Sequence, residues 1–549
     1  MAFITFLIYT LVVAGLSYLI TSKIPQTTSE GYFLGGRSLT AGVIAGSLLL
    51  TNLSTEQIVG LNGQAFSEGI LVMCWETLAA IAMVVTALFL LPRYLKGGIT
   101  TIPQFLEERY DVMTRTIASG LFLSGYVVIF LPIVLYSGSL ALITMFDIPA
   151  TMGISHNTAI WLFVWGIGII GSIYAIFGGL KAVAVSDSFN AVGLLIGGLM
   201  IPIFGLMHIG DGSLIEGVSN LYSSAPERFN AIGDRHASVP FSTIFTGMML
   251  VQLFYWGTNQ AIIQRALAAR DLREGQKGLL LAAFFKILGP LILVIPGMIA
   301  YYLFNGQLDI PDQAYPKLVK TVLPVALVGF FAAVLFGAIL SSFNSALNSS
   351  VTLFGLDIYK EHINPDASDD TIIKYGKRFG LFLAFLSMFV APFIAKAPAG
   401  LFGYLQEING CYSIPILTII VVGYLTKWVP PFAAKFAIIS GSIFYSISQF
   451  FLKGYFVDKA VDAAKASGIT DTAQLEMIGI DAYPHFLHVM AILFIANVII
   501  MLIIGKLRPQ EKAYELVHSK DVDITPYRFS IPFGIGIVVV VIFSYLYFS

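Results

Sequence analysis

Several polar and ionisable side chains stand in stretches of sequence that are otherwise apolar. Glu76, Asp187 and Lys286 each lie inside a long hydrophobic run, and residues 51–57 read Thr-Asn-Leu-Ser-Thr-Glu-Gln. Charged groups at bilayer depth cost roughly 2.5 to 3.5 kcal/mol on insertion scales, so they are rarely present without a purpose. A carboxylate and an ammonium are usual partners of hydroxyl-rich ligands. The pattern therefore indicates a polar pocket, although Glu76 and Lys286 could equally form a structural ion pair.

Amide side chains in the same apolar runs complete a candidate pocket for a small polar molecule. Amides donate and accept hydrogen bonds together, as the hydroxyl groups of a sugar or polyol require. The candidate solute-binding residues are Asn52, Gln57, Glu76, Gln252, Lys286 and Gln406.

A second candidate site is formed by neutral oxygens. On a helix the carbonyl of residue i lies near the side chains at i+3 and i+4, so the Ala338 carbonyl and the hydroxyls of Ser341 and Ser342 converge. Three neutral oxygens suit a hard monovalent cation such as sodium. Serines of membrane helices also commonly bond back to their own helix, and this alternative stays open. A break in another helix could offer the carbonyls of Leu50 and Leu53 and complete a five-oxygen shell.

Two broken helices are the elements that must position these residues. Residues 51–57 interrupt an apolar stretch at 40–66, and residues 252–260 interrupt another one five stretches later. Corresponding breaks in two halves of a chain indicate an inverted repeat with a central binding site. Polar residues that merely bridge neighbouring helices of a bundle are the alternative.

The composition places the chain in lipid. Of its 549 residues, 57% are hydrophobic and 11% charged, and the mean hydropathy is +0.83, outside the range of soluble domains. The net charge of −1 gives no sign of a nucleic-acid partner. Both cysteines, Cys74 and Cys411, lie in apolar runs, which makes a disulfide framework improbable. Because no hydrolase constellation, Walker loop or metal-ligand cluster is present, we expect neither an enzyme nor a cofactor.

Stretches of about 20 apolar residues, long enough to cross a bilayer as helices, recur about fourteen times along the chain. We therefore predict an all-α polytopic membrane protein without a soluble domain. The expected spans are 4–22, 40–66, 68–95, 113–145, 158–177, 183–209, 240–260, 274–303, 322–355, 374–396, 398–424, 432–454, 483–504 and 531–548.

Basic residues predict the orientation, because they gather in cytoplasmic loops. With the N-terminus outside, most of the 31 lysines and arginines fall in inside loops, Arg93, Lys96, Arg265 and Lys374 among them. An even number of spans then puts both termini outside the cytoplasm. The first stretch has no basic region before it, so we expect it to be a retained span of a cell-membrane protein.

Four blocks of sequence resemble the sodium/solute symporter family, especially its bacterial sodium/galactose and animal sodium/glucose cotransporters. The blocks occur in the family's order, and the resemblance runs from about Gly31 to the thirteenth span. They are Gly-Tyr-Phe-Leu-Gly-Gly-Arg-Ser-Leu at 31–39, the stretch 52–57, Phe-Gly-Gly-Leu-Lys-Ala-Val at 177–183, and Tyr-Trp-Gly-Thr-Asn-Gln at 255–260 followed by Gln264 and Arg265.

The resemblance implies a LeuT-like core of two inverted five-helix repeats. The expected divisions are a leading helix and cytoplasmic loop at 1–39, the first repeat at 40–209, an extracellular loop at 210–239, the second repeat at 240–424 and three trailing helices at 425–549. The family's sodium site corresponds to Leu50, Leu53, Ala338, Ser341 and Ser342, the set reached above. Asp187 matches an acidic residue on the family's path for sodium toward the cytoplasm.

The resemblance also implies roles around the solute. Gln57, Glu76, Lys286 and Gln406 match sugar-binding positions of the galactose-type relatives. Tyr255 matches the inner aromatic gate, and Leu61 and Phe402 match the outer apolar lid. Two positions depart, because Ala79 replaces a serine and Gln252 replaces an asparagine. The exact sugar is therefore left open.

Together these features predict a sodium-driven importer of a small polar solute, with a hexose as the first choice. A symporter for sialic acid, inositol, a monocarboxylate or an amino acid is the first alternative. A solute sensor with a transporter fold is the second alternative. A long cytoplasmic signalling domain would favour a sensor, and we expect none in this chain.

Overall fold

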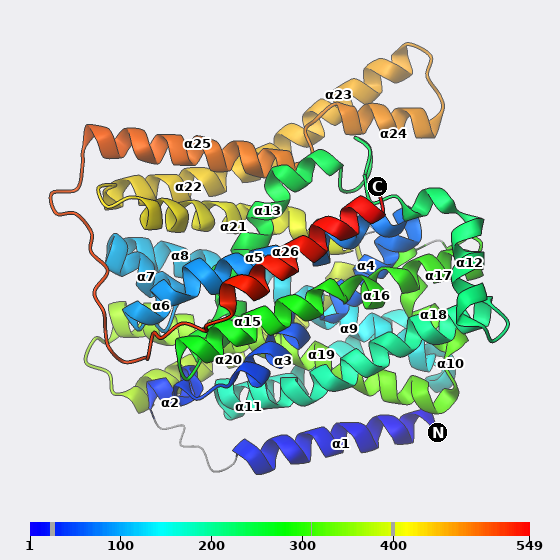
Figure 1. The fold of residues 1–549 in the computed structure, drawn as a ribbon, viewed down its shortest axis with the longest axis horizontal. Helices are drawn as coiled ribbons and strands as arrows, with labels where there is room; N and C mark the ends of the chain where they lie inside the picture. The colour runs from blue at the N-terminus through cyan, green and yellow to red at the C-terminus, as the bar shows by residue number, and fades with distance from the viewer. Residues whose placement is uncertain (22–27, 309, 397–400) are drawn as a thin grey trace.

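The computed structural model describes residues 1–21, 28–308, 310–396 and 401–549, and the regular structure of these residues is helical. Figure 1 shows the long helices running side by side, with both chain ends at the same end of the bundle. A chain that crosses the membrane an even number of times has both of its ends on the same side. Which of the two ends faces the cytoplasm stays a prediction.

The helices of the first half of the chain are α1 (Ala2–Thr21), α2 (Ser29–Phe33), α3 (Ala41–Asn52), α4 (Thr55–Glu68), α5 (Cys74–Val85), α6 (Leu91–Gly97), α7 (Ile102–Arg109), α8 (Val112–Gly125), α9 (Leu131–Phe146), α10 (Ile148–Met152), α11 (His156–Ile209), α12 (Leu214–Ser224), α13 (Gly247–Gly257) and α14 (Gln260–Leu267). Those of the second half are α15 (Leu272–Ile287), α16 (Gly289–Leu293), α17 (Ile295–Leu303), α18 (Ala314–Val322), α19 (Val325–Thr352), α20 (Asp369–Val390), α21 (Leu401–Leu425), α22 (Pro431–Ile447), α23 (Lys453–Ala466), α24 (Thr472–Asp481), α25 (Phe486–Leu507) and α26 (Ser530–Tyr547).

Ten helical runs among the described residues are long and apolar enough to cross a bilayer, or eleven when one bent pair is taken as a span. The count differs from fourteen because the helices are often fused or interrupted. One run, Thr55–Gly97, has 43 residues, and at 1.5 Å per residue it is about twice the thickness of the hydrocarbon core. The predicted number of spans is therefore not confirmed. Two predicted spans, 4–22 and 398–424, also reach residues outside the described part.

Both predicted helix breaks are present in the structure. Helix α3 ends at Asn52, and α4 begins at Thr55 after Leu53 and Ser54. Helix α13 ends at Gly257, and α14 begins at Gln260. Carbonyl groups in the last turn of a helix have no partner within that helix, so each break exposes backbone oxygens inside the bundle.

A third break was not predicted. The span expected at 274–303 bends by 50° between Leu272–Ile287 and Gly289–Leu303. Pro290 follows Gly289 at the bend and cannot supply the N–H that a continuous helix needs. The bend leaves Lys286 in the last turn of α15.

The core of the bundle is formed around α19, which packs against α1, α3, α9 and α11. Its residues from Phe331 to Ile339 are nearly all buried, and its serine-rich second half, 341–350, is buried as well. A long buried helix that carries many hydroxyls requires partners for them. These are the end of α3, residues of α14 and, for Ser345 and Ser350, carbonyls of α19 itself.

Helix α11 contains the junction between two predicted spans. Gly179 has φ 62° and ψ −179°, a conformation that is essentially restricted to glycine. A Cβ atom at this position would also lie 3.3 Å from the Tyr32 ring. The glycine thus permits a direct turn from one span into the next.

We predict that Gly179→Ala destabilises the protein by roughly 1 to 3 kcal/mol, because alanine would be forced into the disfavoured backbone region. The apparent melting temperature in detergent, followed by intrinsic fluorescence, measures the change. Gly166→Ala is the matched control, since Gly166 lies in the same helix with open space around its Cβ position. Equal melting temperatures for the two variants would contradict the interpretation.

Candidate functional site

Four predicted solute-binding side chains form a closed ring of hydrogen bonds. Lys286 Nζ lies 2.5 Å from Glu76 Oε2 and also donates to Asn52 Oδ1. The Asn52 amide donates to Gln57 Oε1 at 2.8 Å, and the Gln57 amide donates to Glu76 Oε1. All four residues are buried. The structure thus brings residues from α3, α4, α5 and α15 into one polar network.

The helix ends explain why a charged pair is stable at this place. Glu76 lies in the first turn of α5 and Lys286 in the last turn of α15. A carboxylate near a helix N-terminus and an ammonium near a C-terminus both interact favourably with the helix dipole. A Cβ on Gly289 would lie 2.4 Å from Glu76 Oε2, so the glycine of the bend leaves room for the carboxylate.

The ring borders a cavity between the broken helices and α21. Its wall combines polar and aromatic side chains: Thr51, Asn52, Glu56, Gln57, Trp75, Ala79, Tyr126, Gln252, Tyr255, Trp256, Asn259, Lys286, Phe402, Gln406, Asn409 and Tyr412 belong to it. The free volume is about 40 Å³, well below the roughly 300 to 1,000 Å³ of most ligand pockets. Side chains of the wall must therefore move before a solute the size of a sugar can enter.

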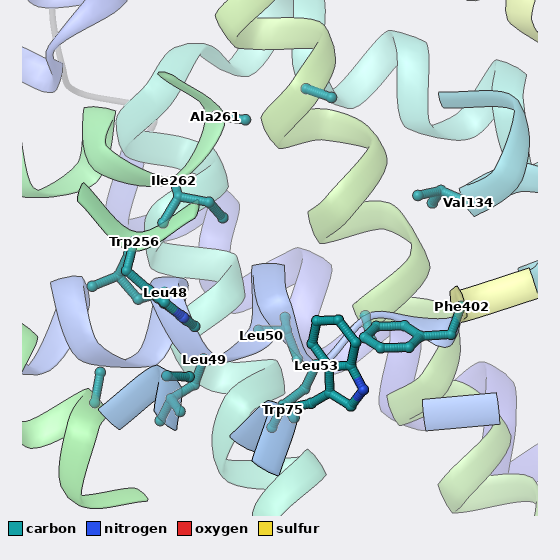
Figure 2. Packing of buried hydrophobic residues seen from close by; sticks show 14 of the residues in the cluster. Leu48, Leu49, Leu50, Leu53, Trp75, Val134, Trp256, Ala261, Ile262 and Phe402 are labelled. Atoms are coloured by element: carbon teal, nitrogen blue, oxygen red, sulfur yellow. The ribbon is translucent and has the colours of Figure 1, made fainter. Parts of the chain in front are cut away.

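An aromatic pair forms one part of the cavity wall. Trp75 and Phe402 pack edge to face, with ring centroids 5.1 Å apart, and Figure 2 shows them side by side beyond Leu53. A Cβ on Gly60 would lie 2.6 Å from the Phe402 Cβ, so only glycine allows α21 to approach α4 this closely. Leu61, the other expected lid residue, is fully buried but lies outside the cavity wall.

The remaining predicted solute and gate residues lie in the wall with other partners. The Gln252 amide donates to the Trp75 carbonyl at 2.9 Å. Gln406 Oε1 accepts from Asn409 at 3.4 Å. Tyr255 stands edge to face with Trp256.

Two of the predicted sodium ligands, Ser341 and Ser342, contact the end of α3. Thr51 Oγ1 lies 3.2 Å from Ser341 Oγ and 3.1 Å from Ser345 Oγ, and the Thr51 carbonyl accepts from Ser342 Oγ at 2.9 Å. The broken end of α3 is thereby held against the middle of α19. Leu50, Leu53 and Ala338 are buried; Leu50 lies in the last turn of α3, Leu53 is its cap, and Ala338 precedes Ser341 by one turn of α19. Sodium binding by these five residues stays a prediction.

Asp187 is connected to this segment through an arginine. Ser47 donates to Asp187 Oδ2 at 2.6 Å, and the Arg265 guanidinium lies 3.8 Å from the same oxygen. Arg265 also donates to the hydroxyls of Ser47 and Ser345. Asp187 and Ser341 further share the wall of a second cavity of about 130 Å³ between α1, α11 and α19.

The buried position of Arg265 corrects the sequence interpretation, which placed this residue in a cytoplasmic loop. Arg265 belongs to α14 and is 0% exposed. The polar residues that follow Asn259 resemble a loop, but they form a short helix whose cation is paired inside the bundle.

Sequence reasoning also missed several residues of the wall. Trp75 precedes the recognised Glu76, and Asn409 lies one helical turn after Gln406, so helical spacing could have identified them. Tyr126 and Tyr412 carried no such signal, because an aromatic residue in a membrane span is ordinary. Thr51 and Arg265 both contact the serines of α19. The sequence analysis named them only as members of longer motifs and gave neither residue this role.

Comparisons with known proteins now identify the class. A sequence profile described as the sodium:solute symporter family matches residues 32–441. The chain belongs to this family. It is therefore a sodium-coupled solute symporter of the membrane rather than an enzyme.

Relatives of this symporter differ in what is known of them. An uncharacterized symporter of Escherichia coli, YidK, is 46% identical over 96% of this chain and 87% of its own length. The sodium/glucose cotransporter of Vibrio parahaemolyticus is 34% identical over 77% of this chain and 80% of its own length. A solved sodium-coupled sialic acid symporter aligns with a TM-score of 0.71 at 19% identity, over 93% of this chain and 99% of that one. At that identity the last match supports the fold alone.

We predict that Lys286→Met destabilises this symporter by about 3 to 5 kcal/mol, because Glu76 is left as a buried charge without its partner. Adding Glu76→Gln removes that charge and should recover a large part of the loss. Thermal unfolding of the single and double variants in detergent measures this coupling. Lys320→Met is the control, since its ion pair with Asp147 is exposed and is worth about 0 to 1 kcal/mol. Purely additive effects would show that the ring does not act as a unit.

Proposed function

We propose that this symporter imports a hexose sugar together with sodium by alternating access. The support comes from two consecutive residues in the last turn of α3. Thr51 contacts the predicted sodium ligands of α19, a region called the ion segment, and Asn52 belongs to the hydrogen-bonded ring. Thr51 binds the serines of α19, and Asn52 binds Lys286 and Gln57. A change at either site therefore acts on the same helix end.

The chemistry of the wall suits a hexose. Amide, carboxylate and ammonium groups match hydroxyls, which donate and accept. Aromatic faces, such as those of Tyr255 and Trp256, suit the apolar faces of a sugar ring. Ala79 and Gln252 are the wall positions at which the sugar-binding set of the relatives is not reproduced, so they bear on which hexose is preferred.

The proposed route of transport follows from the predicted gates in the cavity wall. The solute enters past Phe402 and Trp75 and leaves past Tyr255, the predicted inner gate. Sodium binds between α3 and α19 and leaves by way of Asp187, beside the second cavity. Because the free volume is small, one end must open before the solute enters, as alternating access requires.

The membrane potential supplies enough free energy for this coupling. One positive charge moving through 100 mV releases about 2.3 kcal/mol, which corresponds to a solute gradient of roughly fifty-fold. A sodium concentration gradient adds to this value. No nucleotide is required.

We predict that proteoliposomes containing the purified chain accumulate labelled glucose or galactose when an inward sodium gradient is imposed. Potassium in place of sodium is the control and should abolish accumulation. Competition by unlabelled sialic acid, inositol, lactate and proline ranks the alternative solutes. Failure of every hexose to show sodium-stimulated flux would overturn the proposed substrate class.

We predict that Ser342→Ala raises the sodium concentration for half-maximal uptake by about tenfold or more. Loss of one neutral oxygen from a five-oxygen shell weakens cation binding by an amount comparable to a hydrogen bond to a charged group. Sodium titration of initial uptake rates gives the value. Ser350→Ala is the matched control, because Ser350 lies in the same helix and donates to its own helix at Ala346. Unchanged sodium dependence in Ser342→Ala would remove this residue from the ion site.

A further inference from the structure

One carboxylate in the cavity wall is not used by the ring or by the ion segment. Glu56 is 4% exposed and lies in the first turn of α4. Ser54 donates to its Oε1 atom, whereas no residue in the described part of the chain donates to Oε2. A buried carboxylate oxygen without a donor is costly, so this atom is suited to a donor that arrives with the solute.

A second unpaired group lies in the same wall. The indole N–H of Trp75 is buried, and among the described residues it has no hydrogen-bond acceptor. Among the fully buried polar atoms of the described wall residues, one acceptor and one donor thus have no partner. A hydroxyl-bearing solute can satisfy both, because each hydroxyl donates one hydrogen bond and accepts others.

The charges around the cavity leave Glu56 uncompensated. Glu76 is paired with Lys286, and Asp187 is paired with Arg265. Within the described residues no cation forms an ion pair with Glu56, so an ionised carboxylate there has no countercharge at the cavity wall.

We infer that Glu56 is a further solute contact, which accepts a hydrogen bond from a neutral polyhydroxy solute and excludes solutes that carry a carboxylate. The inference rests on the proposed function and narrows its substrate class. A solute carboxylate would be brought next to a like charge in a poorly solvated site, which is strongly unfavourable. A hexose or a cyclic polyol meets no such repulsion and supplies the missing donor.

The test compares each hexose with its own uronic acid, because the two differ only in a hydroxymethyl group replaced by a carboxylate. Sodium-driven uptake of labelled galactose or glucose into proteoliposomes is inhibited with unlabelled hexose and with the matching uronate at neutral pH. The variants are Glu56→Gln, which removes the charge, and Glu56→Asp, which keeps it. Glu68→Gln is the matched control, since Glu68 ends the same helix and lies outside the cavity wall.

In the unmodified chain the uronate should inhibit at least about tenfold more weakly than the hexose. The measured quantity is the ratio of the inhibition constant of the uronate to that of the hexose. Glu56→Gln should reduce this ratio to about threefold or less and raise the KM for the hexose. Glu56→Asp and Glu68→Gln should leave the ratio unchanged. The ratio in the unmodified chain is informative even where a variant does not fold.

Three results would overturn the inference while the proposed function stands. The uronate could inhibit the unmodified chain as well as the hexose does. The ratio could be unchanged in Glu56→Gln. The variant could alter only the sodium dependence, which would assign Glu56 to the ion. Absence of sodium-stimulated flux of every hexose in the unmodified chain would instead remove the proposed function, and the hexose contact at Glu56 with it.

Discussion

A helix broken inside a membrane must find partners for the backbone groups that the break exposes, and the centre of this symporter is organised by that requirement. Helix α3 stops at Asn52, and its last turn is held by Ser342, Ser341 and Ser345 of α19. Hydrocarbon offers no hydrogen bonds, so these serines stabilise the interruption whether or not a cation is bound. The same interruption places Asn52 beside Lys286. The interruption after Asn52 therefore both requires the serines as hydrogen-bond partners and places polar groups where a solute or an ion can bind.

Much of this centre is predictable from sequence because polar residues are conspicuous in apolar stretches. The breaks after Asn52 and Gly257, and the meeting of Glu76 with Lys286, follow from that contrast. Features that do not stand out from the surrounding sequence were not predicted. The bend at Leu288 lies in apolar sequence, and Arg265 resembled a loop residue because its partners, Ser47 and Asp187, are distant in the chain.

The number of crossings illustrates a different limit. Hydrophobicity predicts where the chain is in lipid, but the number of crossings also depends on where the backbone turns. The run Thr55–Gly97 is too long for a single crossing, and its backbone leaves the helical region at Gly69, where φ is 82° and ψ −148°. In α11 the backbone angles of Gly179 form the junction between the predicted spans 158–177 and 183–209. Leu61 shows the same limit at the site, because its burial follows from hydrophobicity but its distance from the cavity wall depends on packing.

The adjacency of Thr51 and Asn52 restricts how this pocket can change over evolutionary time. Neighbouring residues of a helix point about 100° apart, so replacing Asn52 to suit another solute also disturbs the turn that Thr51 anchors to α19. Wall positions remote from that turn are free of this conflict. Ala79, on α5, and Gln406, on α21, border the same cavity, and among the described residues neither side chain is hydrogen-bonded to a serine of α19. New solute preferences in such a carrier should therefore arise first at these remote positions, while the end of α3 changes slowly.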